Sequence, residues 1–142
     1  MNSGQRHAAQ ECELFGQRSR QKSADANQIR TASEEWVRAF NAKNGAGIAA
    51  VYTADAVLLP PDAAPIEGLE AISGFWGEFA SSVESASLKI QEVFVDGDLA
   101  NVIGTFKLEV AGEQPLTGKY VEMWTRGEAG WRMHRDIWNA TP

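Results

Sequence analysis

The sequence predicts a single α+β domain, in which three N-terminal helices pack on one face of a curved, mostly antiparallel β-sheet. Between residues 28 and 79, apolar side chains recur at the spacing of amphipathic helices, and beyond residue 86 they alternate as in strands. With 142 residues, 44% of them hydrophobic, the chain is long enough to bury a core without disulfides or metal.

Each helix is predicted from apolar residues that fall on one face. The first covers residues 28–43 and begins at Asn27 or Thr31, whose side chains can cap it. Its apolar residues are Ile29, Ala32, Trp36, Val37 and Phe40. A short second helix covers residues 47–52, and a third opens at Gly68. The third helix carries Leu69, Ile72, Phe75, Trp76 and Phe79.

Five strands are predicted after or between these helices. A brief strand over residues 56–59 is halted by Pro60–Pro61. Four longer strands cover residues 87–95, 99–110, 117–126 and 131–139. Because short turns such as Asp96–Gly97–Asp98 join them, we expect an antiparallel meander.

Residues 1–27 differ from the rest, because Leu14–Phe15 is their only large apolar pair. Two interpretations stay open: a flexible or partly helical arm, or an amphipathic arm that docks on a partner subunit. The domain itself then spans residues 28–142. No continuous apolar stretch of the kind that a secretory signal requires is present, so we expect a cytoplasmic protein.

Composition excludes several partners. The net charge of −6, from 13 basic and 19 acidic residues, argues against nucleic-acid binding. No apolar run is long enough for a membrane span. Cys12 is the single cysteine, and His134 the single histidine outside the N-terminal arm, so we expect neither a disulfide nor a metal, and no cofactor.

Five stretches of the sequence resemble one known family. They are residues 50–57, 66–68, 70–76, 96–100 and 130–138, the last with Gly130–Trp131 and Asp136–Ile137–Trp138. In order and spacing they are similar to the SnoaL-like/DUF4440 branch of the NTF2-like superfamily, which includes ketosteroid isomerases. The resemblance covers residues 28–140. It implies a cystatin-like cone, in which the sheet and helices enclose one deep apolar pocket, in a homodimer.

Three polar residues on the last two strands are candidates for catalysis: Glu122, His134 and Asp136. Side chains alternate along a strand, which places Glu122 on the face of Tyr120 and Trp124, and His134 on that of Asp136 and Trp138. The predicted register sets Tyr120 near Asp136 and Glu122 near His134. In an apolar pocket the two acids would have raised pKa values and could exchange protons near neutrality. Each residue can also serve as a hydrogen-bonded structural group, and that alternative stays open.

The resemblance implies catalytic roles for Glu122, Asp136 and His134, and it also shows where two catalytic residues of the isomerases are replaced. Glu122 matches the oxyanion-hole acid of ketosteroid isomerases, whereas Asp136 resembles the acid–base residue of SnoaL-type polyketide cyclases, with His134 as a partner. Pro60 stands where the isomerases have their general base and Trp36 where they have a tyrosine. Proline accepts no proton on its side chain, so we do not expect ketosteroid isomerisation by the usual mechanism.

An aromatic wall is expected around these acids. Its predicted ligand-binding residues are Trp36, Phe40, Tyr52, Leu58, Trp76, Tyr120, Trp124 and Trp138. Such a wall suits a flat, apolar or aromatic molecule that carries a carbonyl or hydroxyl group.

Two functions follow from this pattern. The first is a cofactor-independent enzyme of the isomerase, cyclase or lyase kind that moves protons on an apolar carbonyl compound. The second is a non-catalytic module that binds a ligand or forms a homodimer. The dimer would use the outer sheet face, where we expect Val121, Met123, Met133 and Ile137 to leave an apolar patch.

Overall fold

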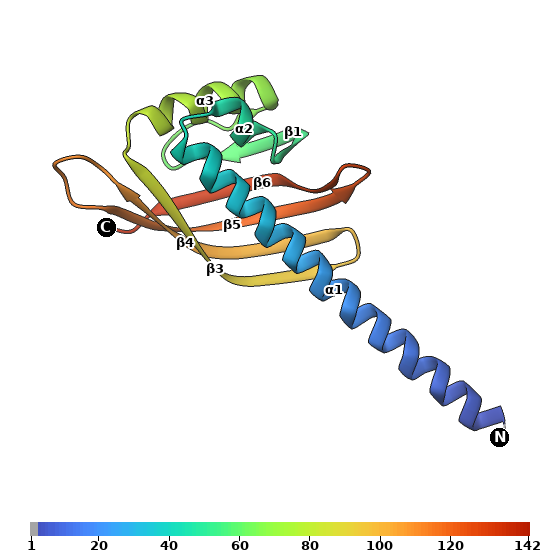
Figure 1. The fold of residues 1–142 in the computed structure, drawn as a ribbon. Helices are drawn as coiled ribbons and strands as arrows, with labels where there is room; N and C mark the ends of the chain where they lie inside the picture. Colours follow the sequence, from blue (N-terminus) through green and yellow to red (C-terminus); the bar gives the residue numbers. More distant parts are fainter. Residues whose placement is uncertain (1–2) are drawn as a thin grey trace.

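The computed structural model describes the backbone of residues 3–142 and the side chains from Glu13 onward. Its helices are α1 (Ser3–Asn41), α2 (Gly45–Ala49) and α3 (Leu69–Ser81). Its strands are β1 (Tyr52–Leu59), β2 (Ile66–Glu67), β3 (Ser85–Asp96), β4 (Leu99–Glu109), β5 (Leu116–Gly127) and β6 (Gly130–Ala140). They form one sheet in the order β2-β1-β6-β5-β4-β3, in which β1 and β6 are parallel and the other described pairs are antiparallel. The helices lie over one side of this sheet, so the predicted fold class is confirmed (Figure 1).

The first helix is much longer than predicted. It begins at Ser3, so Asn27 and Thr31 lie inside it and cap nothing. Its N-terminal half projects beyond the sheet, and its other half crosses the sheet (Figure 1). Its buried residues, where it crosses, are Asp25, Ile29, Ser33, Trp36 and Phe40. The predicted arm is thus helical from Ser3 onward, and residues 1–2 of it lie outside the described part.

A buried carboxylate ties this long helix to the turn between β5 and β6. Asp25, which is 2% exposed, accepts hydrogen bonds from Arg126 Nη1 at 2.8 Å and from Trp131 Nε1 at 3.0 Å. Gln21 Nε2 donates a third at 3.1 Å, and Arg126 also pairs with Asp98. A buried charge with this many donors is well satisfied, so Asp25 fixes where α1 crosses the sheet.

The C-terminal end of α1 is held by close contacts with its neighbours. Asn41 exchanges two hydrogen bonds with the backbone of Ala86 on β3, at 3.2 and 2.8 Å. Gly45 opens α2 so close to α3 that a Cβ there would lie 2.4 Å from the carbonyl oxygen of Ser73. The second helix is shorter than predicted, because Tyr52 is the first residue of β1 rather than the last of the helix.

One irregularity in β6 decides which side chains face inward. Trp124 pairs with Met133 and its neighbour Met123 pairs with Arg135, which leaves His134 as an extra, bulged residue. The alternation along β6 therefore changes phase at His134. Met133 is 1% exposed and lies in the core, so its predicted place on the outer face is wrong. No helix in the described part of the chain combines the length and apolar character that a membrane crossing needs.

Candidate functional site

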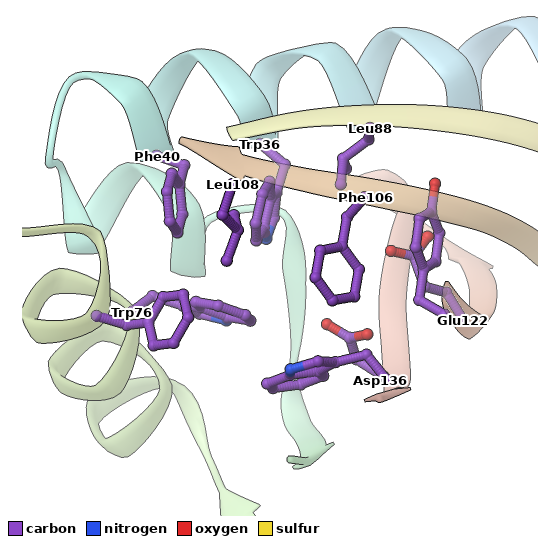
Figure 2. A pocket seen from close by; sticks show the side chains of 11 residues that line it. Trp36, Phe40, Trp76, Leu88, Phe106, Leu108, Glu122 and Asp136 are labelled. Atoms are coloured by element: carbon purple, nitrogen blue, oxygen red, sulfur yellow. The ribbon is translucent and has the colours of Figure 1, made fainter. Parts of the chain in front are cut away.

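The helices and the inner face of the sheet enclose an apolar pocket with two carboxyl groups at one end (Figure 2). The cavity among its side chains is small, about 50 Å³, and it continues into open solvent at its mouth. The lining residues are Trp36, Phe40, Trp76, Phe79, Leu88, Phe106, Leu108, Tyr120, Glu122, Asp136 and Trp138. Aromatic residues from α1 and α3 stand at one end, and the acids from β5 and β6 at the other (Figure 2). The pocket therefore has an apolar body and a polar end.

Trp76 is at the centre of the aromatic wall. Its ring stacks on Trp138 at a centroid distance of 5.1 Å and an interplanar angle of 29°. It meets Trp36 edge-on, also at 5.1 Å, and Phe40 at 6.1 Å. Offset stacks and edge-to-face pairs are the stable arrangements of aromatic rings, so the wall is a fixed surface against which a flat molecule can lie.

The two acids of the pocket lie directly opposite each other. Glu122 on β5 pairs with Asp136 on β6, and each is 5% exposed. The predicted register was wrong by two residues, because Tyr120 pairs with Trp138 and the bulge removes His134 from this face. The observed register pairs the two carboxyl groups directly with each other.

Burial makes both acids hard to ionise. Loss of solvation raises the pKa of Asp136 to about 7, against a hydrogen bond from Tyr52 that lowers it. Loss of solvation also raises the pKa of Glu122 well above its usual value, and the nearby charge of Asp136 raises it further. Trp124 Nε1 donates to Glu122 Oε1 at 3.0 Å, which partly opposes this. Near neutral pH the pair can therefore hold one proton and exchange another.

A tyrosine behind the pocket wall positions Asp136. The Tyr52 hydroxyl donates to Asp136 Oδ2 at 2.8 Å and accepts from Trp36 Nε1 and Trp76 Nε1, each at 3.1 Å. Burial raises the pKa of Tyr52 well above its usual value, so it stays a donor. Because Oδ2 is held in this way, Oδ1 is the oxygen of Asp136 left for a ligand.

With the geometry established, the family can be assigned. Residues 33–135, which include Trp36, Trp76 and Glu122, match the family model of the SnoaL-like domain, and Asp136 and Trp138 follow directly after the matched part. The chain belongs to the SnoaL-like domain family. The resemblance predicted from the sequence is thus confirmed. No curated protein matches this SnoaL-like chain.

Solved structures share the fold at low sequence identity. A cystatin-like domain of unknown function from Nostoc punctiforme is 20% identical, with a TM-score of 0.75 over 84% of this chain and 78% of that one. A ketosteroid isomerase-like protein from Erwinia carotovora atroseptica is 21% identical, with a TM-score of 0.70 over 80% and 95%. An NTF-2 like protein of unknown function from Shewanella oneidensis is 14% identical, with a TM-score of 0.71 over 80% and 97%. The SnoaL-like domain thus has the NTF2-like, cystatin-like fold.

The structure places only part of the predicted site in the pocket. Glu122 and Asp136 line it, as do the predicted ligand-binding residues Trp36, Phe40, Trp76, Tyr120 and Trp138. Three others are core residues outside the lining, namely Tyr52, Leu58 and Trp124. His134 is also absent from the lining. Its Nδ1 lies 2.8 Å from Thr53 Oγ1 and 3.6 Å from Asp55, which is exposed.

Four lining residues were missed by the prediction of the site: Phe79, Leu88, Phe106 and Leu108. Phe106 and Leu108 are two positions apart on β4, and Leu88 pairs with Phe106 across β3. Strand alternation could have found these three, because it places them on one inner face, and helical spacing places Phe79 on the same side of α3 as Trp76. In the part of the chain that the structure describes, no group of three or more His, Cys, Asp or Glu side chains could hold a metal ion.

Proposed function

We propose that this SnoaL-like domain binds a flat apolar carbonyl compound and transfers a proton on it, with Asp136 as base and Glu122 as acid. One observation carries the proposal: two buried carboxyl groups lie on paired positions at the polar end of an aromatic pocket. Buried acids destabilise the fold, so their presence points to a functional use. Acids with raised pKa values in a cleft are typical of proton-transfer sites.

The proton transfer is an enolisation. The ionised Asp136 takes a proton from the carbon next to the carbonyl, so a C–H bond breaks and an O–H bond forms on the carboxylate. The electron pair of the C–H bond forms a C=C bond, and the π pair of the carbonyl moves to its oxygen, which the protonated Glu122 stabilises by donating a hydrogen bond. Return of a proton from Asp136 to carbon completes an isomerisation or an exchange. The raised pKa of Asp136, about 7, gives it both protonation states at neutral pH.

Exchange of carbon-bound hydrogen tests this function directly. In D₂O, we expect the protein to speed deuterium uptake into the methyl group of 2-acetylnaphthalene, followed by proton NMR. Asp136→Asn removes the base and should reduce the rate at least about a hundredfold. Asp62→Asn is the matched control, since Asp62 is exposed on the loop after β1 and lies outside the pocket. A wild-type rate equal to that of buffer would contradict the proposed proton transfer and favour a non-catalytic binding module.

A second candidate function is association, favoured by the outer sheet face. Ile103, Val121 and Ile137 pair across β4, β5 and β6, and are 38, 45 and 49% exposed. A continuous apolar row of this kind is typical of an interface. We propose that two copies of the SnoaL-like domain pair through this row, which would shield it from water.

Analytical ultracentrifugation checks the dimer. We expect a dimer at micromolar concentration, and a monomer for Val121→Lys, which puts a charge in the middle of the row. Ala129→Lys adds the same charge in the exposed turn between β5 and β6, and should stay dimeric. A wild-type protein that sediments as a monomer contradicts this interface.

A further inference from the structure

One polar atom of the pocket wall has an unmet hydrogen bond. Tyr120 is 5% exposed, and its hydroxyl is the one buried side-chain oxygen or nitrogen of the described residues without a partner. A buried hydroxyl left unpaired destabilises a protein by about 1–3 kcal/mol. The contrast with Tyr52 is sharp, because that hydroxyl makes three hydrogen bonds. A buried group that no protein atom pairs calls for an explanation, and a ligand in the pocket can supply the partner.

The chain makes specific room for this side chain. Gly104 on β4 is paired directly with Tyr120, and a Cβ on Gly104 would lie 2.3 Å from the tyrosine hydroxyl. Any other residue at position 104 would therefore push the ring out of its place. Tyr120 and Glu122 are two positions apart on β5, so both face inward and line the same pocket.

The charges near the Tyr120 hydroxyl determine which class of ligand it can bind. Burial, then the charges of Glu122 and Asp136, raise the pKa of Tyr120 against the smaller opposing effect of the Arg30 charge, so the hydroxyl keeps its proton and can donate it in a hydrogen bond. Burial also raises the pKa of Glu122, which keeps that acid protonated as a second donor. An anionic ligand would meet the charge of Asp136 in a pocket whose lining includes no lysine or arginine. A neutral ligand avoids this repulsion, and an oxygen on it can accept hydrogen bonds from both donors.

We propose that the Tyr120 hydroxyl binds the carbonyl oxygen of a neutral aryl ketone, whose rings lie against the aromatic wall of Trp76 and Trp138. The ligand class rests on the proposed function, but the binding step does not depend on proton transfer. Tyr120 therefore sets specificity for a carbonyl over a hydrocarbon, since no protein group among the described residues pairs with its hydroxyl.

Three naphthalene probes test this specificity: 2-acetylnaphthalene, 2-ethylnaphthalene and 2-naphthoate. Binding is followed by the quenching of tryptophan fluorescence, since three of the lining residues are tryptophans. We expect the ketone to bind about tenfold more tightly than the hydrocarbon, which is the net effect of one hydrogen bond of about 1.4 kcal/mol. Tyr120→Phe should remove this preference and leave hydrocarbon binding unchanged. The carboxylate should bind most weakly at pH 8.

A second measurement separates a ligand-binding hydroxyl from a structural one. The ligand-free Tyr120→Phe protein should unfold at the same temperature as the wild type or a higher one, because the variant lacks the unpaired hydroxyl. A lower unfolding temperature, an unchanged preference for the ketone, or tight binding of the carboxylate would each overturn the proposal. Ketone binding that needs Tyr120, without any deuterium exchange, would support this inference and refute the proposed enzyme.

Discussion

The free energy of unfolding should fall as the pH rises from 5 to 8, the reverse of the trend set by carboxylates in surface ion pairs. The cause is Asp136, whose pKa is raised from 3.8 to about 7 by burial. Between these two values the folded protein holds a proton that the unfolded chain has released. Stability is therefore complete below pH 4 for this group, and is lost as the pH rises through about 7. Glu122, whose pKa is also raised, continues the loss at higher pH.

The expected size of this effect makes it easy to measure. One pKa unit corresponds to about 1.4 kcal/mol, so Asp136 alone accounts for a loss on the order of 4 kcal/mol between its unfolded and folded pKa values. Urea denaturation at pH 5, 6, 7 and 8, followed by circular dichroism, gives the stability at each pH. The double variant Glu122→Gln and Asp136→Asn keeps the shape of both side chains but cannot ionise. It should show little dependence on pH, and should be the more stable protein at pH 8.

A matched pair of exposed acids serves as the control. Asp62 and Glu113 lie in loops and are exposed, so the double variant Asp62→Asn and Glu113→Gln should keep the full slope of the wild type. Wild-type stability that is constant or rises between pH 5 and 8 would show that the two carboxyl groups of the pocket ionise freely. In that case neither acid could keep a proton at neutral pH, and the proposed proton transfer would lose its physical basis.

The architecture could be predicted from the sequence where the apolar period was long and regular. The spacing of Ile72, Trp76 and Ala80, all buried, defines α3, and alternation on either side of the bulges defines the four long strands. The N-terminal half of α1 could not be predicted in this way. Apart from the exposed pair Leu14 and Phe15, its described side chains are mostly polar, so its helical form rests on local propensity rather than on burial.

The sequence was enough to predict the two acids of the site. It was not enough to predict their arrangement, because that depends on the bulge in β6. Glu122 and Asp136 were found because acids on an inward strand face stand out among apolar neighbours. His134 was misplaced because a one-residue bulge changes the phase of everything on one side of it. A signal was present, since Trp131 and Met133 follow one alternation and Asp136 and Trp138 follow the other. The sequence alone does not show at which residue between Met133 and Asp136 the alternation changes phase.

Tyr52→Phe should destabilise the protein by about 3–5 kcal/mol, although it removes a single oxygen atom. That hydroxyl is the shared partner of two buried indole N–H groups and of one carboxyl group. Its loss leaves Trp36 and Trp76 each with an unpaired buried donor, and each such donor costs about 1–3 kcal/mol. It also removes the hydrogen bond that lowers the pKa of Asp136, so that pKa should rise above about 7. Urea denaturation measures the first effect. A shift of the deuterium-exchange profile to higher pH measures the second.

Tyr120→Phe is the chemical twin of this variant and is expected to act in the opposite direction. Both tyrosines are at least 95% buried in the same domain, since Tyr52 is 1% and Tyr120 is 5% exposed, so the two changes remove the same atom from similar surroundings. They differ in what the hydroxyl contacts: three partners for Tyr52, and none for Tyr120. If hydrogen bonding within the fold decides stability, Tyr52→Phe lowers the urea midpoint strongly and Tyr120→Phe does not. Equal losses in the two variants would mean that Tyr120 has a partner in the folded protein. Its hydroxyl would then be structural, and the carbonyl of the ligand would have to be bound by Glu122 alone.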